Sequence, residues 1–141
     1  MVEQILNNNE ILAIILRNSY KNDGIEFFTP EYFSQQLAFM HHKQGNIIQP
    51  HFHNIIKKEI LDTQEILFIK KGKIKVNFYN KENIFLFSNI LETGDIILLV
   101  TGGHGFEMLE DTDLIEIKQG PYAGNDDKTR FIPKYYNKDD I

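Results

Sequence analysis

The chain has 141 residues, a formal net charge of −5 and no cysteine. These values fit a single globular domain and exclude disulfides, cysteine-ligated zinc and thiolate catalysis. Because the basic residues are scattered along the chain, nucleic-acid binding has little support. The N-terminal residues lack the features of a signal peptide, and the apolar run at 11–16 is too short to cross a membrane. We therefore expect a cytoplasmic protein.

Short apolar runs separated by Gly, Asn and Asp predict β-strands along most of the chain. Residues 10–18 are expected to form the first strand, with a short helix as the alternative. Residues 35–42 and 46–53 are predicted to form two further strands joined near Gly45. Pro50 cannot donate to a ladder, so it suits a strand edge or a bulge.

In the second half of the chain, short apolar runs are again separated by turn-forming residues. Residues 65–79 predict a hairpin around a turn at Lys71-Gly72. Strands are expected at 83–91 and 95–100, and a further pair at 104–110 and 113–119. No convincing amphipathic helix exceeds two turns. Many short strands at near-regular spacing favour an all-β barrel or sandwich.

The C-terminal residues 120–141 are polar and turn-rich but carry aromatic side chains. We expect an ordered segment that packs on the barrel through Phe131 and Tyr135, with the last few residues loose. No linker, fixed-period repeat or low-complexity block divides the chain. We therefore expect one domain over 1–141, with a core at about 35–118 and both terminal segments packed on it.

Two histidines lie one residue apart, in PHFHN at 50–54. On a strand, His51 and His53 would point to the same side, which suggests a metal ion, a shared proton or chance. Glu65 opens the next predicted strand, and His104 begins a later one after Thr-Gly-Gly. Both precede apolar residues on their own face, so these strand ends would place three imidazoles and a carboxylate at one mouth of a barrel.

The spacing of these residues resembles that of the cupin family. The strings GNIIQPHFH (45–53) and EILFIKKG (65–72) are similar to the first cupin motif, and GDIILLVTGGHG (94–105) is similar to the second. The resemblance covers roughly residues 35–118 and implies a double-stranded β-helix, a jelly-roll barrel. The metal ligands that it implies are His51, His53, Glu65 and His104.

The chain departs from the family pattern in two places. Eleven residues separate His53 from Glu65, more than the family usually has, and we expect them to form a loop over the mouth. This insert offers Glu59 as a rival ligand, although Glu65 has the expected spacing to Gly72. The second motif carries Thr-Gly-Gly where the family has a proline before its glycine, and His104 is the histidine available there.

Three imidazoles and one carboxylate, without a thiolate, suit Fe(II), Mn(II), Ni(II) or Zn(II). The leading hypothesis is a metal-dependent cupin that acts on a small oxygenated molecule, either a sugar derivative or a keto acid. The string at 102–122 also resembles small bacterial cupins associated with sugar or cell-surface glycan gene sets. Isomerisation and oxygenation both stay open; isomerisation needs a base, for which His42 and Glu59 are candidates.

Two other hypotheses use the same residues differently. In the first, the cup holds a metal and a small ligand without turnover. In the second, the chain is a metal-free sugar-nucleotide epimerase or isomerase, which would use a histidine base, a carboxylate partner and a tyrosine acid. Lys118 and Arg130 could hold an anionic ligand, but a solvated surface position is the expectation for each.

The expected partners are a small-molecule ligand and a second copy of the chain, with neither nucleic acid nor membrane. Cupins often pair through edge strands, which buries an open sheet edge. The apolar run at 10–16 is the candidate for this contact, and we expect a homodimer.

Overall fold

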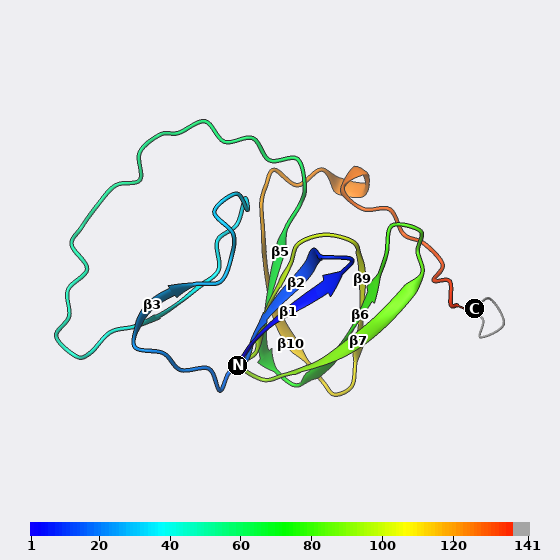
Figure 1. The fold of residues 1–141 in the computed structure, drawn as a ribbon, viewed down its shortest axis with the longest axis horizontal. Helices are drawn as coiled ribbons and strands as arrows, with labels where there is room; N and C mark the ends of the chain where they lie inside the picture. The colour runs from blue at the N-terminus through cyan, green and yellow to red at the C-terminus, as the bar shows by residue number, and fades with distance from the viewer. Residues whose placement is uncertain (137–141) are drawn as a thin grey trace.

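The structure is a computed structural model that describes residues 1–136, and these residues contain β-strands and one short 3-10 helix but no α-helix. The all-β prediction is confirmed. The larger sheet contains, in spatial order, β1 (Val2–Asn7), β2 (Glu10–Leu16), β8 (Ile96–Leu99), β5 (Glu65–Lys71) and β10 (Asp113–Lys118). The smaller sheet contains β7 (Phe85–Glu92), β6 (Lys73–Tyr79) and β9 (Gly103–Met108). A third, two-stranded sheet pairs β3 (Gly24–Phe27) with β4 (Ala38–His41). All three sheets are antiparallel, and within the described residues none closes into a barrel (Figure 1).

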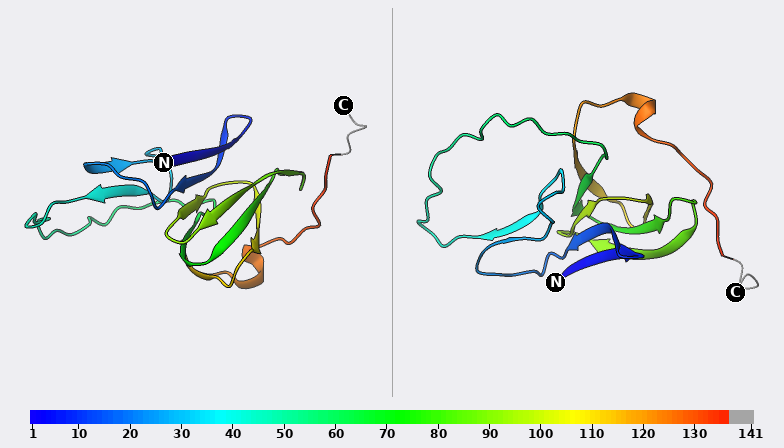
Figure 2. Two further views of the ribbon diagram at one scale, coloured as in Figure 1. Left: turned by 90° about the horizontal axis from the view of Figure 1, so that it is seen from below. Right: turned by 45° about the horizontal axis from the view of Figure 1, so that its top comes forward.

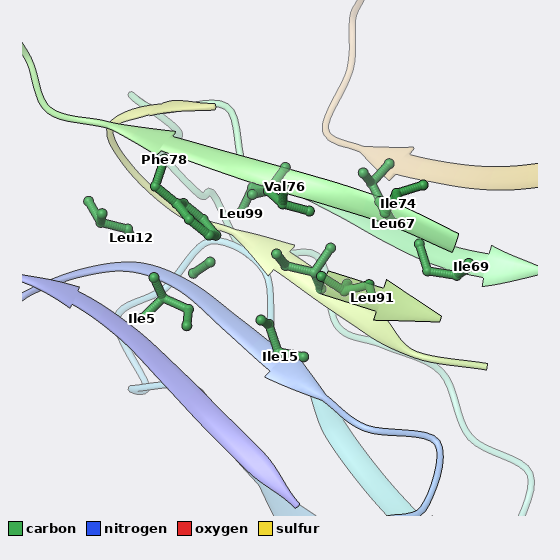
Figure 3. Close-up of a cluster of buried hydrophobic side chains, with 12 residues drawn as sticks. Ile5, Leu12, Ile15, Leu67, Ile69, Ile74, Val76, Phe78, Leu91 and Leu99 are labelled. Carbon is green, nitrogen blue, oxygen red and sulfur yellow. The ribbon is translucent and has the colours of Figure 1, made fainter. Parts of the chain in front are cut away.

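The main hydrophobic core lies between the two sheets. On β6, Ile74, Val76 and Phe78 are buried and alternate with more exposed polar residues, as expected for a strand with one face inward. They pack against residues of the larger sheet such as Leu67 and Leu99 (Figure 3). The N-terminal strands also contribute to this core, which therefore begins well before residue 35.

A second core covers the outer face of the larger sheet. Ile14 and Leu98 are fully buried there, together with Leu37 from the segment that joins β3 (Gly24–Phe27) to β4 (Ala38–His41). Burial on both faces explains why β2 and β8 read as continuous apolar runs instead of alternating ones.

The strand pairing differs from the predicted pairing. β5 and β6 follow each other in the chain but belong to different sheets, so the predicted 65–79 hairpin is wrong, and so is the predicted pair formed by β9 and β10. At the β5–β6 crossing, Gly72 has a φ of +94°, and a Cβ there would lie 2.5 Å from the carbonyl oxygen of Asp111. The observed hairpin joins β6 to β7, with Phe78 opposite Phe87.

The apolar run at 10–16 forms β2, which confirms the strand and excludes the helix. β2 pairs with β1 on one side and with β8 on the other. It therefore lies inside the sheet, and the prediction that it forms an exposed dimer edge is wrong. The edge strand of the larger sheet on that side is β1.

Residues 42–63, which we call the open segment, differ most from expectation. The predicted strand at 46–53 is absent, and every residue of the open segment is exposed. Figure 1 and Figure 2 show this segment, coloured cyan to green, looping away from the two sheets. Of the predicted strand at 35–42, only residues 38–41 form one, as β4, which pairs with β3.

The C-terminal segment returns to the sheets after the 3-10 helix η1 (Gly124–Asp127). The ring of Phe131 lies 5.3 Å from that of Tyr79, and the ring of Tyr135 lies 5.6 Å from that of Phe85. The predicted packing through these two aromatic residues is confirmed. The last residues, expected to be loose, include 137–141, which lie outside the described residues. In the described part of the chain, no helix is long and apolar enough to cross a membrane.

Burial on both faces of the larger sheet makes a testable prediction. Ile97 and Leu98 are neighbours on β8, both are 0% exposed, and they point into different cores. Ile97→Ala and Leu98→Ala should each lower the free energy of unfolding by about 2–5 kcal/mol in urea titrations, because each leaves a cavity. Ile117→Ala, at a side chain that is 54% exposed, is the control and should cost less than about 1 kcal/mol. A control-sized effect at either β8 position would show that one face is not packed.

Candidate functional site

A cleft of about 590 Å³ opens where β5 and β9 begin. The two sheets contribute Glu65, Tyr79 and His104 to its wall, and the C-terminal segment contributes Lys128, Arg130 and Phe131. The segment is held close because the Phe131 ring lies against Gly103, where a Cβ would approach it to 2.8 Å. The cleft is therefore built by both sheets and by the chain that follows β10.

Glu65 and His104 meet in this cleft although they lie far apart in the sequence. Glu65 is the first residue of β5 in the larger sheet, and His104 lies near the start of β9 in the smaller one. His104 Nε2 is 3.3 Å from Glu65 Oε2, and the Glu65 side chain is 8% exposed. The contact therefore links the two sheets at the open end of the core.

Two lysines also approach the Glu65 carboxylate. Lys118, opposite Glu65 in the β5–β10 ladder, places its Nζ 3.8 Å from Oε1, and Lys128 Nζ lies 3.5 Å from the same oxygen. The hydrogen bond with His104, aided by its electrostatic contribution and by the charges of Lys128 and Lys118, outweighs desolvation and lowers the pKa of Glu65 from 4.5 to about 2. Glu65 is therefore a carboxylate at neutral pH.

The basic residues Lys118, Lys128 and Arg130 lie at the cleft, where the sequence did not place them. Lys118 was expected on the solvated surface, but its side chain is 20% exposed and lies 3.1 Å from Glu116 and 3.5 Å from Asp127. Arg130 is exposed, as expected, yet it lines the cleft. Sequence reasoning missed Lys128 because no periodic pattern links the C-terminal segment to β5.

The structure brings together two of the four predicted metal ligands. Glu65 and His104 are in contact, whereas His51 and His53 lie in the exposed open segment, with ring centroids 5.3 Å apart. Among residues 1–136, no three His, Cys, Asp or Glu side chains are grouped closely enough to hold a metal ion. The full set of four ligands therefore stays a prediction.

The two candidate bases also lie in the open segment. His42 Nδ1 is 3.0 Å from Asn46 Nδ2, Glu59 is exposed, and neither residue lines the cleft. The tyrosine in the cleft wall is Tyr79, which is 7% exposed and whose pKa is raised by burial. The cleft wall thus carries His104, Glu65 and Tyr79, together with Asp127 and Lys128, as side chains able to exchange a proton.

The β9 strand has an unpaired edge beside this cleft. It pairs with β6 on one side and is the last strand of its sheet on the other. Phe106 and Met108 lie opposite Val76 and Ile74, whose side chains are fully buried, yet they are 37% and 50% exposed. The inward face of the sandwich is therefore uncovered at this edge.

The open segment exposes many apolar side chains and has almost no backbone hydrogen bonds within the described residues. Within the described residues, its only backbone–backbone hydrogen bond runs from the Asn46 N–H to the Lys43 carbonyl. Such a length of unpaired backbone and exposed apolar surface is unusual in a folded chain. Its large exposed hydrophobic side chains are those of Ile47, Ile48, Phe52, Ile55, Ile56, Ile60 and Leu61.

Comparison of the chain with protein-family models, with curated proteins and with solved structures finds no match. Function must therefore be inferred from the cleft, the β9 edge and the open segment.

The charge of Glu65 predicts a specific pH dependence of stability. A carboxyl group whose pKa is lowered on folding stabilises the native state above its ordinary pKa of 4.5, and this contribution is lost as the pH falls towards about 2. The free energy of unfolding of the wild type should therefore fall more steeply across this interval than that of Glu65→Gln. Glu59→Gln, in the exposed open segment, is the control and should follow the wild type. Parallel profiles for wild type and Glu65→Gln would contradict the assignment.

Proposed function

We propose that this chain is a metal-dependent jelly-roll protein of the cupin type that acts on a small oxygenated molecule such as a sugar derivative. The observation that carries the proposal is the 3.3 Å contact between Glu65 and His104 in a cleft at the open end of the core. These are two of the four ligands that the spacing of the sequence predicts, and they come from different sheets.

The jelly roll would be completed by the open segment. Residues 46–53 are predicted from the sequence to form a strand, and within residues 1–136 β9 presents an unpaired edge with Phe106 and Met108 partly exposed. Adding this strand beside β9 would satisfy the backbone groups of both and would cover the uncovered face. With His51 and His53 facing inward, their imidazoles would lie on the side of the sheet that carries His104.

The chain is long enough for this movement. The open segment ends at Thr63, which lines the cleft, so one end is already at the site. Twelve residues lead from His53 to Glu65, and a fully extended chain of that length spans about 40 Å. The segment is therefore long enough for His51 and His53 to reach Glu65 and His104.

The residues fit a divalent transition metal by their chemistry. Glu65 is already ionised, His104 adjoins it, and His51 and His53 would supply two more imidazoles to a set without thiolates. Fe, Mn, Ni or Zn bound there would act as a Lewis acid or lower the pKa of a bound water. Tyr79 and Phe131 form part of the wall that would exclude solvent. His42 and Glu59, the candidate bases, would approach the cleft only with the open segment.

The same contact supports a second candidate function. His104 could act as a base oriented by the Glu65 carboxylate, with Tyr79 as the acid, in a metal-free epimerase or isomerase. This reading needs neither His51 nor His53 and leaves the open segment unexplained. A binding protein without turnover is the third candidate, and it would share the metal site of the first.

Metal content separates these functions. Wild type refolded or expressed with Fe, Mn, Ni or Zn should bind roughly one ion per chain, measured by elemental analysis after dialysis. His51→Ala with His104→Ala should lose the ion because two ligands are removed, while circular dichroism stays unchanged. His41→Ala, in exposed β4, is the control and should keep the ion.

Two outcomes would contradict the metal proposal. A double variant that keeps its ion would overturn the ligand set. A wild type that binds none of the four metals, but loses turnover in His104→Ala, would favour the metal-free reaction.

We also propose a homodimer, now through β1 in place of β2. β1 is the free edge of the larger sheet, and Leu6 on it is 45% exposed. Leu6→Lys should convert the dimer to a 16.5 kDa monomer in analytical ultracentrifugation, because a charge on an edge strand opposes pairing. Ile132→Lys, at a side chain that is 87% exposed, should leave the dimer intact. A monomeric wild type would refute the proposal.

A further inference from the structure

One imidazole and two ammonium groups surround the Glu65 carboxylate, whose oxygens a bound metal ion would also need. Its oxygens lie 3.3 Å from His104 Nε2, 3.5 Å from Lys128 Nζ and 3.8 Å from Lys118 Nζ. A metal ion bound to the same oxygens would compete with both lysines for the carboxylate. Metal binding would therefore leave ammonium groups beside the ion without their present partner.

The two lysines differ in what they could pair with instead. Lys118 keeps Glu116 at 3.1 Å and Asp127 at 3.5 Å. Lys128 has no ion pair within residues 1–136 other than that with Glu65. Arg130, two residues further on, makes no ion pair in the same part of the chain, and both residues line the cleft. Because Lys128 has extended backbone angles, this spacing favours the same side of the segment.

We propose that Lys128 and Arg130 bind the acid group of a small anionic ligand in this cleft, a carboxylate or a phosphate, whose remaining oxygens face Glu65 and His104. The inference rests on the proposed metal site and names the charge class of its ligand. An arginine fork and a lysine ammonium are suited to the oxygens of either acid group. The negative charge of the ligand would replace that of Glu65 as the partner of these cationic side chains when Glu65 binds the metal ion.

Metal and anion should then bind cooperatively. The anion removes the repulsion between the ion and the two cationic side chains, so it should tighten metal binding, and the ion should tighten anion binding by the same factor. Typical couplings between binding sites are about 5- to 150-fold.

The test measures Mn(II) affinity by electron paramagnetic resonance of the free ion, without anion, with inorganic phosphate and with lactate. In the wild type, at least one anion should tighten Mn(II) binding about fivefold or more. Lys128→Gln with Arg130→Gln should lose this effect and, without anion, bind Mn(II) at least as tightly as the wild type. Lys21→Gln with Lys70→Gln removes two exposed lysines elsewhere and should behave as the wild type.

The outcomes separate this inference from the proposed function. An effect of phosphate alone would indicate a phosphorylated ligand, and an effect of lactate alone a carboxylate; both support the inference. Mn(II) binding that neither anion changes, or an anion effect that survives in the Lys128/Arg130 variant, would overturn it and leave the metal site standing. A wild type that binds no metal would overturn both.

Discussion

The contact between Glu65 and His104 is the interaction on which the site depends. It joins β5 of the larger sheet to β9 of the smaller one at the end of the core, and it places a nearly buried carboxylate there. A carboxylate in such a position needs nearby positive charge, which explains why Lys118 from β10 and Lys128 from the C-terminal segment approach the same oxygens. Ionisable side chains from both large sheets and from the C-terminal segment therefore meet in the cleft.

The β9 edge and the open segment complement each other. Within residues 1–136, β9 has one unpaired edge, and its inward side chains Phe106 and Met108 are partly exposed. The open segment has apolar side chains and unpaired backbone, and it carries His51 and His53. If the open segment moved beside β9, the two could hydrogen-bond to each other. This movement would also bring the imidazoles of His51 and His53 to the side of the sheet where His104 lies. On the proposed function, a metal ion held by all four ligands would favour this closed arrangement, since it would bind tightly only with the segment in place.

Much of this arrangement could be predicted from sequence. Alternation along 73–79 predicts the inward face of β6, and the inward positions of Glu65 and His104 predict that they meet. Strand pairing could not be predicted, because alternation identifies the inward face of a strand and not its neighbour, and Gly72 looks the same in a hairpin as in a crossing between sheets. The sequence of residues 46–53 predicted a strand, but it does not show which strand these residues would pair with, and in the structure they pair with none. Lys128 owes its place to the path of the C-terminal segment, which has no periodic signal.

We propose that, when the metal is bound, residues 46–53 lie beside β9 and bring His51 and His53 to Glu65 and His104. A crystal structure of the zinc-loaded protein, with data collected at the zinc absorption edge, tests it most directly. The account predicts one anomalous peak bonded to nitrogens of all three histidines at about 2.0–2.1 Å and to a Glu65 oxygen at about 2.0–2.2 Å, with the segment hydrogen-bonded to β9. An open segment detached from β9, with zinc absent from Glu65 and His104 or bound there without His51 and His53, would contradict it.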